Sequence, residues 1–153
     1  MAVIGASRDE TKLGFGVCRN LAGSGYAGAI HFVNPKTTEI LGRPCYPSIA
    51  AVPDPVDLAV VIVPAAAVAA TMHECGRRGV KIAIVVSGGF GEGGPEGKAL
   101  EEEIARVARQ YGMRLVGPNC IGVIDTHTPV NTTFVKSVPE RGDIAFVSQS
   151  GAI

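Results

Sequence analysis

The chain has 153 residues, the size of one domain, and 46% of them are hydrophobic while 18% are charged. This composition supports a buried core and excludes intrinsic disorder. Lys and Arg (14) balance Asp and Glu (14), only 5% of the residues are aromatic, and none is Trp. The basic surface and the aromatic platforms of nucleic-acid-binding proteins are therefore missing, and we expect no nucleic-acid partner.

The sequence also indicates a soluble chain without a metal site. Its richest apolar run, residues 56–72, contains Asp57 and Pro64 and falls short of the roughly 18–20 uninterrupted apolar residues of a membrane span. The four cysteines are scattered without a CxxC pair, and the three histidines stand alone, which argues against both a disulfide framework and a zinc site. We expect a cytoplasmic domain with reduced thiols and no membrane contact.

Strand and helix patterns alternate along the chain. Apolar residues recur at helical spacing after Phe15 and after Val68, and Pro95 opens a third helix that stops at Gly112. Between them lie short apolar runs, of which 58–63 and 81–86 are continuous enough to be buried on both faces. The expected strands are 2–4, 29–33, 58–63, 81–86 and 114–116. This alternation predicts an α/β fold: a Rossmann-like, doubly wound parallel sheet with helices on both faces, in which 58–63 and 81–86 are central or near-central.

The pattern loosens after Gly122. Residues 125–140 are typical of a loop, and 143–147 predict another strand followed by a Ser/Gly turn with no helix after it. We therefore expect a domain over 1–125, and a connecting segment with the start of a second α/β domain over 126–153, in a chain that looks truncated.

Candidate ligand-binding residues follow the ends of the predicted strands. In open α/β sheets, ligands bind outside the carboxyl ends of the strands. Turns always collect Gly, Pro, Ser and Asn, so one such turn says little, but five at one edge favour a crevice. The residues are Gly5, Ala6, Ser7, Arg8 and Gly14, then Asn34, Pro35 and Lys36, then Val63, Pro64 and Ala65, then Ser87, Gly88, Gly89 and Phe90, and finally Asn119 and Cys120.

The first two turns argue against a nicotinamide site. Gly5, Ser7 and Gly14 do not have the GxGxxG spacing, and Asn34 stands where an acidic residue would hold the ribose of NAD. Lys36 could instead hold a phosphate as a point charge. The glycines at the first turn still allow backbone N–H groups and a helix N-terminus to approach a phosphate.

Five segments together resemble the N-terminal CoA-binding domain of NDP-forming acyl-CoA synthetases, the group that includes ADP-forming acetyl-CoA synthetases and the alpha subunit of succinyl-CoA synthetase. They are residues 3–7, 33–36, 63–65, 87–92 and 117–122, in family order, and the Gly-Pro-Asn-Cys stretch of the last is the most specific. The tail 146–152 resembles the start of the family's second α/β domain.

The resemblance implies a role for each turn. Residues 5–8 would cradle the phosphates of coenzyme A, and Lys36 would face its adenosine end. Pro64 and Ala65 would line the pantetheine groove, residues 87–90 would contact its outer part, and Asn119 and Cys120 would lie near the thiol.

The resemblance also implies that this chain holds no catalytic residue. The family's phosphorylated histidine lies beyond Ile153, and ATP or ADP and Mg²⁺ would bind in C-terminal domains or a partner ATP-grasp subunit. Cys120 has no histidine near it in sequence to activate it, so a packed thiol is the expected state. The chain by itself would therefore not be a complete enzyme.

Three functions stay open. The first is the CoA-binding domain of an acid–CoA ligase. The sequence beyond Ile153 would distinguish it from the second. The second is a non-catalytic CoA-binding or regulatory module, such as one fused to an acetyltransferase. The third, a nicotinamide-dependent oxidoreductase, is disfavoured by Asn34 and by the glycine spacing.

Overall fold

The computed structural model describes residues 1–137 and 139–144. Most of the strand expected over 143–147, and the turn after it, lie outside these residues. The elements in chain order are β1 (Ala2–Ile4), α1 (Leu13–Gly23), β2 (His31–Val33), β3 (Glu39–Ile40), β4 (Arg43–Tyr46), the short 3-10 helix η1 (Ile49–Ala51), β5 (Leu58–Val61), α2 (Ala65–Arg77), β6 (Ile82–Val85), the short 3-10 helix η2 (Gly91–Gly93), α3 (Pro95–Tyr111), β7 (Arg114–Val116), β8 (Ile124–Asp125) and β9 (Val130–Asn131).

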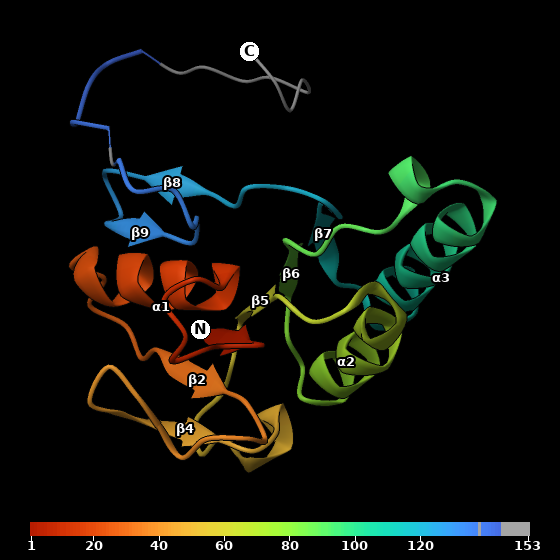
Figure 1. The fold of residues 1–153 in the computed structure, drawn as a ribbon, viewed down its shortest axis with the longest axis horizontal. Helices are drawn as coiled ribbons and strands as arrows, with labels where there is room; N and C mark the ends of the chain where they lie inside the picture. The colour runs from red at the N-terminus through yellow and green to blue at the C-terminus, as the bar shows by residue number, and fades with distance from the viewer. Residues whose placement is uncertain (138, 145–153) are drawn as a thin grey trace.

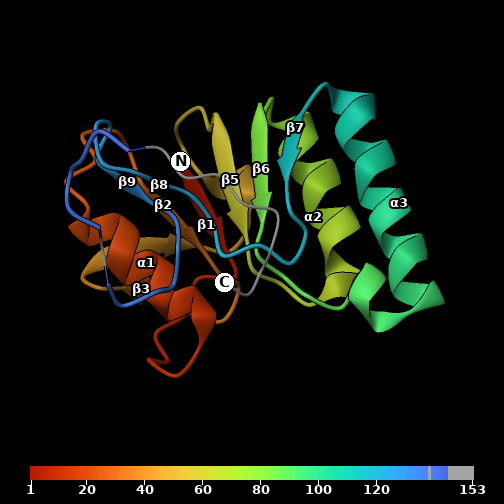
Figure 2. The same ribbon diagram turned by 90° about the horizontal axis from the view of Figure 1, so that it is seen from above.

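A seven-stranded sheet in the order β3-β4-β2-β1-β5-β6-β7 forms the centre of the fold. All its pairings are parallel except β3 with β4. β5 pairs with β1 and β6, and β6 pairs with β5 and β7, so the two runs predicted to be central are interior strands. Figures 1 and 2 show α1 on one side of the sheet and α2 with α3 on the other. The predicted doubly wound α/β architecture is confirmed.

Each face of the sheet packs its own hydrophobic core, because side chains alternate along every strand. Val3, Phe32, Val60 and Ile84 point toward α1, where Leu21 lies fully buried. The alternate residues point toward α2 and α3. They pack with Val68, Met72, Cys75, Ile104 and Val107 of those helices, and they are Ala2, Ile4, Val33, Ala59, Val61, Ala83 and Val85.

The third helix begins and ends where the sequence predicts. Pro95 occupies its first turn, where a missing N–H costs nothing, and Gly112 takes a left-handed conformation (φ 64°) at its end. Ile104 and Val107 face the sheet, whereas Glu102 and Arg106 are exposed. The charges of this helix thus form the expected solvated face.

Two features were not predicted. A short hairpin of β3 and β4 extends the sheet beyond β2, with β4 pairing in parallel to β2. A second hairpin, β8–β9, begins at Ile124, continues into the segment predicted to be a loop, and packs beside α1 (Figure 1). The prediction of a continuous loop over 125–140 is therefore wrong at these positions.

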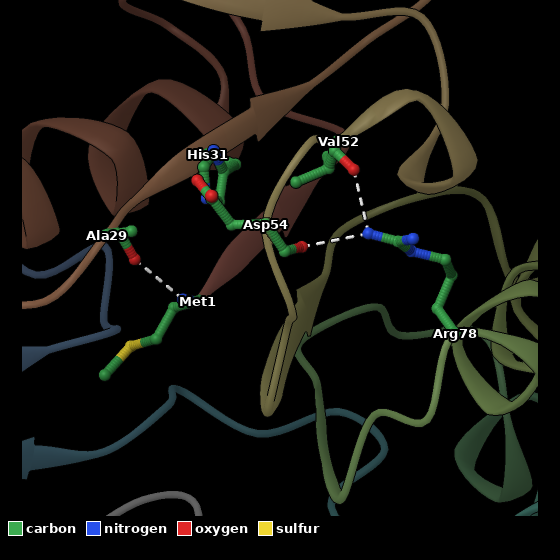
Figure 3. Close-up of polar contacts among 6 residues, drawn as sticks. All are labelled: Met1, Ala29, His31, Val52, Asp54 and Arg78. Atoms are coloured by element: carbon green, nitrogen blue, oxygen red, sulfur yellow. Dashed lines mark hydrogen bonds and ion pairs between the residues drawn. The ribbon is translucent and has the colours of Figure 1, made fainter.

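The amino-terminal edge of the sheet is fastened by polar contacts shown in Figure 3. Arg78, at the end of α2, donates from Nη2 to the carbonyl oxygens of Val52 (2.8 Å) and Asp54 (2.9 Å). His31 Nε2 lies 3.4 Å from Asp54 Oδ2, and burial lowers the pKa of this imidazole. These contacts hold the segment that leads into β5, at the edge opposite the predicted ligand site.

Candidate functional site

A crevice opens at the carboxyl ends of β1, β2 and β5. β1 lies between β2 and β5, and the chain leaves β1 through α1 on one face and leaves β5 through α2 on the other. The turns after β1 and β5 therefore diverge. The place where they separate is the topological switch point, at which doubly wound sheets bind ligands. The crevice has a volume of about 640 Å³ and is lined by residues 4–7, 33–36, 47–49 and 62–64 with Lys12, Thr71 and Glu74.

Glycines at the first turn bring three segments into close contact. Gly5 has φ 90°, and a Cβ atom there would lie 2.0 Å from the carbonyl oxygen of Ile62. A Cβ atom at Gly14 would lie 2.2 Å from the carbonyl oxygen of Gly5. The start of α1 is thus seated directly behind the β1 turn. Among the described residues no side chain caps α1, and no acidic residue occupies its first turn, so the helix dipole gives positive potential at its N-terminus, beside this edge.

The loop from Ser7 to Lys12 is shaped by its own side chains. The backbone N–H of Asp9 donates to Ser7 Oγ (3.0 Å), and Asp9 Oδ1 accepts from both the N–H and the hydroxyl of Thr11. The Thr11 bonds hold the pKa of Asp9 below its usual range. Ser7 and Lys12 line the crevice, whereas Arg8 is exposed on the loop and does not.

Asn34 joins the second turn to the first. Its Nδ2 donates to the carbonyl oxygen of Ala6 (2.6 Å), and its Oδ1 accepts from the N–H of Lys36 (2.8 Å). Lys36 is exposed and lines the crevice beside the β1 turn. An aspartate at position 34 could accept from Lys36 but could not donate to Ala6. Asn34, at the position where a nicotinamide site would have an acidic residue, therefore has a structural role that needs its amide.

We expect Asn34→Asp to lower the free energy of unfolding by about 1–3 kcal/mol at neutral pH, because a carboxylate would face the Ala6 carbonyl without a donor between them. Urea unfolding measures this change. Acidification to about pH 3–4 protonates the introduced carboxyl, so the difference from the native chain should narrow as the pH falls. A difference that stays constant with pH would show that charge at this position is not its cause.

The turns after β6 and β7 form a second group along the same edge. Ser87 Oγ donates to the carbonyl oxygen of Val63 (2.6 Å), and the N–H of Asn119 donates to the carbonyl oxygen of Ser87 (2.9 Å). Asn119 adopts φ 54°, a left-handed conformation that asparagine tolerates. A Cβ atom at Gly88 would lie 3.1 Å from Asn119 Oδ1, a tight contact that brings these two turns close together.

Two carboxylates fix the loop after Ser87. The N–H of Gly89, whose φ is 95°, donates to Glu92 Oε1 (2.5 Å), and the N–H of Gly91 donates to Glu101 Oε2 (3.1 Å). The Gly89 hydrogen bond lowers the pKa of Glu92. Phe90 is fully buried in the core shared with α2 and α3. Between the buried Ser87 and Phe90, the exposed residues are Gly88 and Gly89.

Cys120 is a packed thiol. Its Sγ lies half-buried and donates to the carbonyl oxygen of Val85 (3.3 Å), and burial raises its pKa. A protonated thiol is a poor nucleophile. The geometry thus supports a structural role for this side chain in the turn.

The structure brings together about half of the sequence-predicted residues in the crevice itself. Lys12, which is not among the predicted site residues, lies with them. Ala65, Ser87–Gly89, Asn119 and Cys120 lie farther along the edge, Gly14 is buried behind Gly5, and Phe90 is in the core. The crevice residues among those predicted are Gly5, Ala6, Ser7, Asn34, Pro35, Lys36, Val63 and Pro64.

Sequence reasoning missed one wall of the crevice. Residues 47–49 follow β4, and Thr71 and Glu74 lie on α2 one turn apart. The Pro47-Ser48 turn after the Cys45-Tyr46 pair was the available signal for a short strand end at this edge. The two α2 residues are polar positions in an alanine-rich helix, a weaker signal.

Comparison with known proteins assigns the family. Residues 1–126 match the family described as CoA binding domain. The chain belongs to this family. The CoA-binding domain accounts for most of the chain, and coenzyme A is the ligand that the family name gives.

Longer relatives carry the same domain. The chain is 51% identical over 152 residues to acetate–CoA ligase [ADP-forming] I of Archaeoglobus fulgidus, covering 99% of this chain and 22% of that protein. It is 45% identical over 153 residues to the alpha subunit of acetate–CoA ligase [ADP-forming] II of Pyrococcus furiosus, covering 100% of this chain and 33% of that subunit. The chain therefore spans between a fifth and a third of these curated relatives.

Solved structures agree with the fold. A crystal structure of a protein from Pyrococcus horikoshii OT3 superposes with a TM-score of 0.94 at 46% identity, covering 99% of this chain and 34% of that one. Acetyl-coenzyme A synthetase 1 of Ca. Korarchaeum cryptofilum, solved with phosphate and ADP, superposes with a TM-score of 0.92 at 42% identity. The match covers 99% of this chain and 32% of that one. The predicted resemblance to acyl-CoA synthetases is confirmed.

The described residues lack both a membrane-spanning helix and a metal-binding cluster. None of the helices over 1–137 and 139–144 is both long and apolar enough to cross a membrane. Within the same residues, no three His, Cys, Asp or Glu side chains are grouped so that they could hold a metal ion.

Proposed function

We propose that the CoA-binding domain holds coenzyme A along the carboxyl edge of its sheet and serves as the CoA-recognition part of an ADP-forming acid–CoA ligase. The observation that carries the proposal is the crevice at the switch point, where the Gly5 turn, the start of α1, Lys12 and Lys36 converge. Backbone N–H groups, a helix N-terminus and two ammonium groups are suited to a ligand with phosphates.

The second group of turns supports an extended ligand. The arm of a ligand whose phosphates lie at the crevice would pass Pro64 and Ala65. It would then reach the exposed Gly88–Gly89 backbone and Asn119. In this order, the adenosine of CoA would lie near Lys36 and its thiol toward the β6–β7 end. The pantetheine arm has amides that can exchange hydrogen bonds with backbone groups such as these.

The residues of this edge are suited to recognition rather than to bond making. Cys120 is a protonated thiol, and His31 lies at the opposite edge of the sheet. His73 contacts the Tyr111 hydroxyl (3.3 Å) between α2 and α3, and His127 is exposed on the β8–β9 hairpin. Joining an acid to CoA with ATP cleavage would require phosphoryl-transfer groups, ATP and Mg²⁺ in further domains or in a partner subunit.

Lys36 provides the test of this ligand orientation. CoA carries a 3′-phosphate that dephospho-CoA lacks, so we expect Lys36→Ala to weaken CoA binding about fivefold while changing dephospho-CoA binding little. The effect should shrink at high salt, because Lys36 is exposed. Isothermal titration of both ligands measures it, with Lys98→Ala on α3 as the matched control. Equal losses for the two ligands would mean that Lys36 does not contact the 3′-phosphate.

A non-catalytic CoA-binding module is the second candidate, since this edge would serve it equally well. The two are separated by expressing the longer protein that contains this domain and following thioester formation from acid, CoA and ATP. ATP-dependent thioester formation supports the ligase, and CoA binding without it supports the module.

A further inference from the structure

A second cavity of about 480 Å³ lies away from the crevice and shares no lining residue with it. One wall is the second half of α1, from Arg19 to Ser24, and the other is the β8–β9 hairpin. Residues 139 and 141 complete it. Figure 1 shows this hairpin lying along α1, on the face of the sheet opposite α2 and α3. This volume suits a small metabolite.

A guanidinium group is fixed at this cavity. Arg19 donates from Nε (3.1 Å) and Nη2 (2.9 Å) to Asn20 Oδ1. The same Asn20 donates from Nδ2 to the carbonyl oxygens of Thr133 (2.8 Å) and Val135 (2.7 Å), which follow β9. The segment after β9 therefore orients Asn20, and Asn20 orients Arg19, while the Nη1 donors of the guanidinium have no partner among the described residues. An oriented guanidinium binds oxyanions with less entropy loss than a free one.

The other polar groups of the cavity also favour an anion. Arg141 adds a second guanidinium, and within the described part of the chain neither arginine forms an ion pair. The carboxylate of Asp125 is engaged in the hairpin turn, where its Oδ1 accepts from the N–H groups of His127 (2.8 Å) and Thr128 (3.2 Å). Among the described residues, the lining thus has two cations and one anion, and the Asp125 carboxylate accepts hydrogen bonds within its own turn.

A buried amide donor lies in the same wall. Asn131 is only 2% exposed, and its Oδ1 accepts from both the N–H (3.0 Å) and the hydroxyl (2.7 Å) of Thr133. Its Nδ2 has no hydrogen-bond partner among the described residues. A buried donor without a partner is costly, and such groups are normally satisfied by a ligand or by water.

We propose that this cavity is a second binding site, distinct from the CoA crevice, for a small molecule that carries an oxyanion, either a carboxylate or a phosphate. Arg19 and Arg141 bind the charged group, and the amide of Asn131 lies close behind it. Ile124, Pro129 and Val130 contact the apolar body of the ligand.

Titration of the ¹⁵N-labelled chain tests the site, with inorganic phosphate in one arm and butyrate in the other. We expect one probe or both to shift the side-chain NH₂ signals of Asn131 saturably at millimolar concentration. Arg19→Gln combined with Arg141→Gln should weaken this binding about tenfold while leaving CoA affinity unchanged. The matched control is Arg106→Gln with Arg109→Gln on the exposed face of α3.

The arms give separate answers. A response to butyrate alone identifies a carboxylate site, and a response to phosphate alone identifies a phosphate site. The absence of saturable shifts with both probes would overturn the proposal, and so would an equal loss of binding in the α3 control. Asn131→Asp is a further variant that keeps the Thr133 hydrogen bonds and replaces the free donor by an acceptor. If Asn131→Asp binds the probes as the native chain does, the amide has no part in the site.

Discussion

Gly5→Ala is expected to lower the free energy of unfolding by about 3 kcal/mol or more and to abolish CoA binding at the crevice. The new Cβ atom would lie 2.0 Å from the Ile62 carbonyl oxygen, and this backbone atom cannot move without shifting the end of β5. The residue would also have to hold φ 90°, which L-amino acids rarely adopt. A domain of this size has only about 5–15 kcal/mol to lose.

Gly79→Ala separates the two causes. Gly79 has φ 76°, but a Cβ atom there would meet no heavy atom within 4 Å. Its replacement should cost only the conformational strain, about 1–2 kcal/mol. Urea unfolding of both variants gives the steric contribution as the difference. Equal destabilisation would show that the β1 turn can move away from β5, and the close packing at the crevice would then not be required.

Phe90→Ala is expected to destabilise the domain by about 3–5 kcal/mol, the cost of deleting a fully buried aromatic side chain. The ring packs in the core beneath α2 and α3, although the residue belongs to a loop that the sequence assigns to the ligand site. Phe90→Leu retains most of the apolar volume, and we expect it to cost about 1.5 kcal/mol.

The same two variants separate the core role of Phe90 from a ligand-binding role. Phe90→Leu, measured where it is fully folded, should bind CoA with the native affinity, because the side chain has no exposed surface. Val123→Ala, a change at a side chain 39% exposed, should alter stability by less than about 1 kcal/mol and serves as the control. A folded Phe90→Leu protein with much weaker CoA binding would contradict this assignment.

The sheet could be predicted because its interior strands leave a strong trace in the sequence. A strand buried on both faces must be apolar at every position, and residues 58–61 and 82–85 are the strands β5 and β6. Helix α3 was predictable from Pro95, Gly112 and the apolar stripe between them. These signals are local, so the sequence alone contains them.

The two hairpins, β3–β4 and β8–β9, have no comparable signal in the sequence. β3, β8 and β9 have two residues each, and β4 begins with Arg43 and Pro44, which are exposed. These strands exist because of their partners: β4 pairs with β2, and the segment after β9 is held to α1 by hydrogen bonds from Asn20. Contacts between residues more than 100 positions apart are not readable from periodicity.

The candidate site shows the same division. The turns after β1, β2 and β5 were predictable, because the carboxyl ends of parallel strands share one edge. The hydrogen bond from Asn34 to the Ala6 carbonyl could not be predicted, because it depends on how two turns contact each other. The position of Phe90 was also beyond reach, because a residue after a strand can turn its side chain either to the ligand or to the core.

The most direct test of the proposed site is a titration of the ¹⁵N-labelled chain with CoA, followed through its backbone amide signals. We expect saturable shifts concentrated in residues 5–7, 34–36 and 62–65, with smaller ones at 87–89 and 119–120. The signals of 19–24 and 124–131, around the second cavity, should stay unchanged. Saturable shifts centred away from the carboxyl edge of the sheet, or no saturable shift at all, would contradict CoA binding in this crevice.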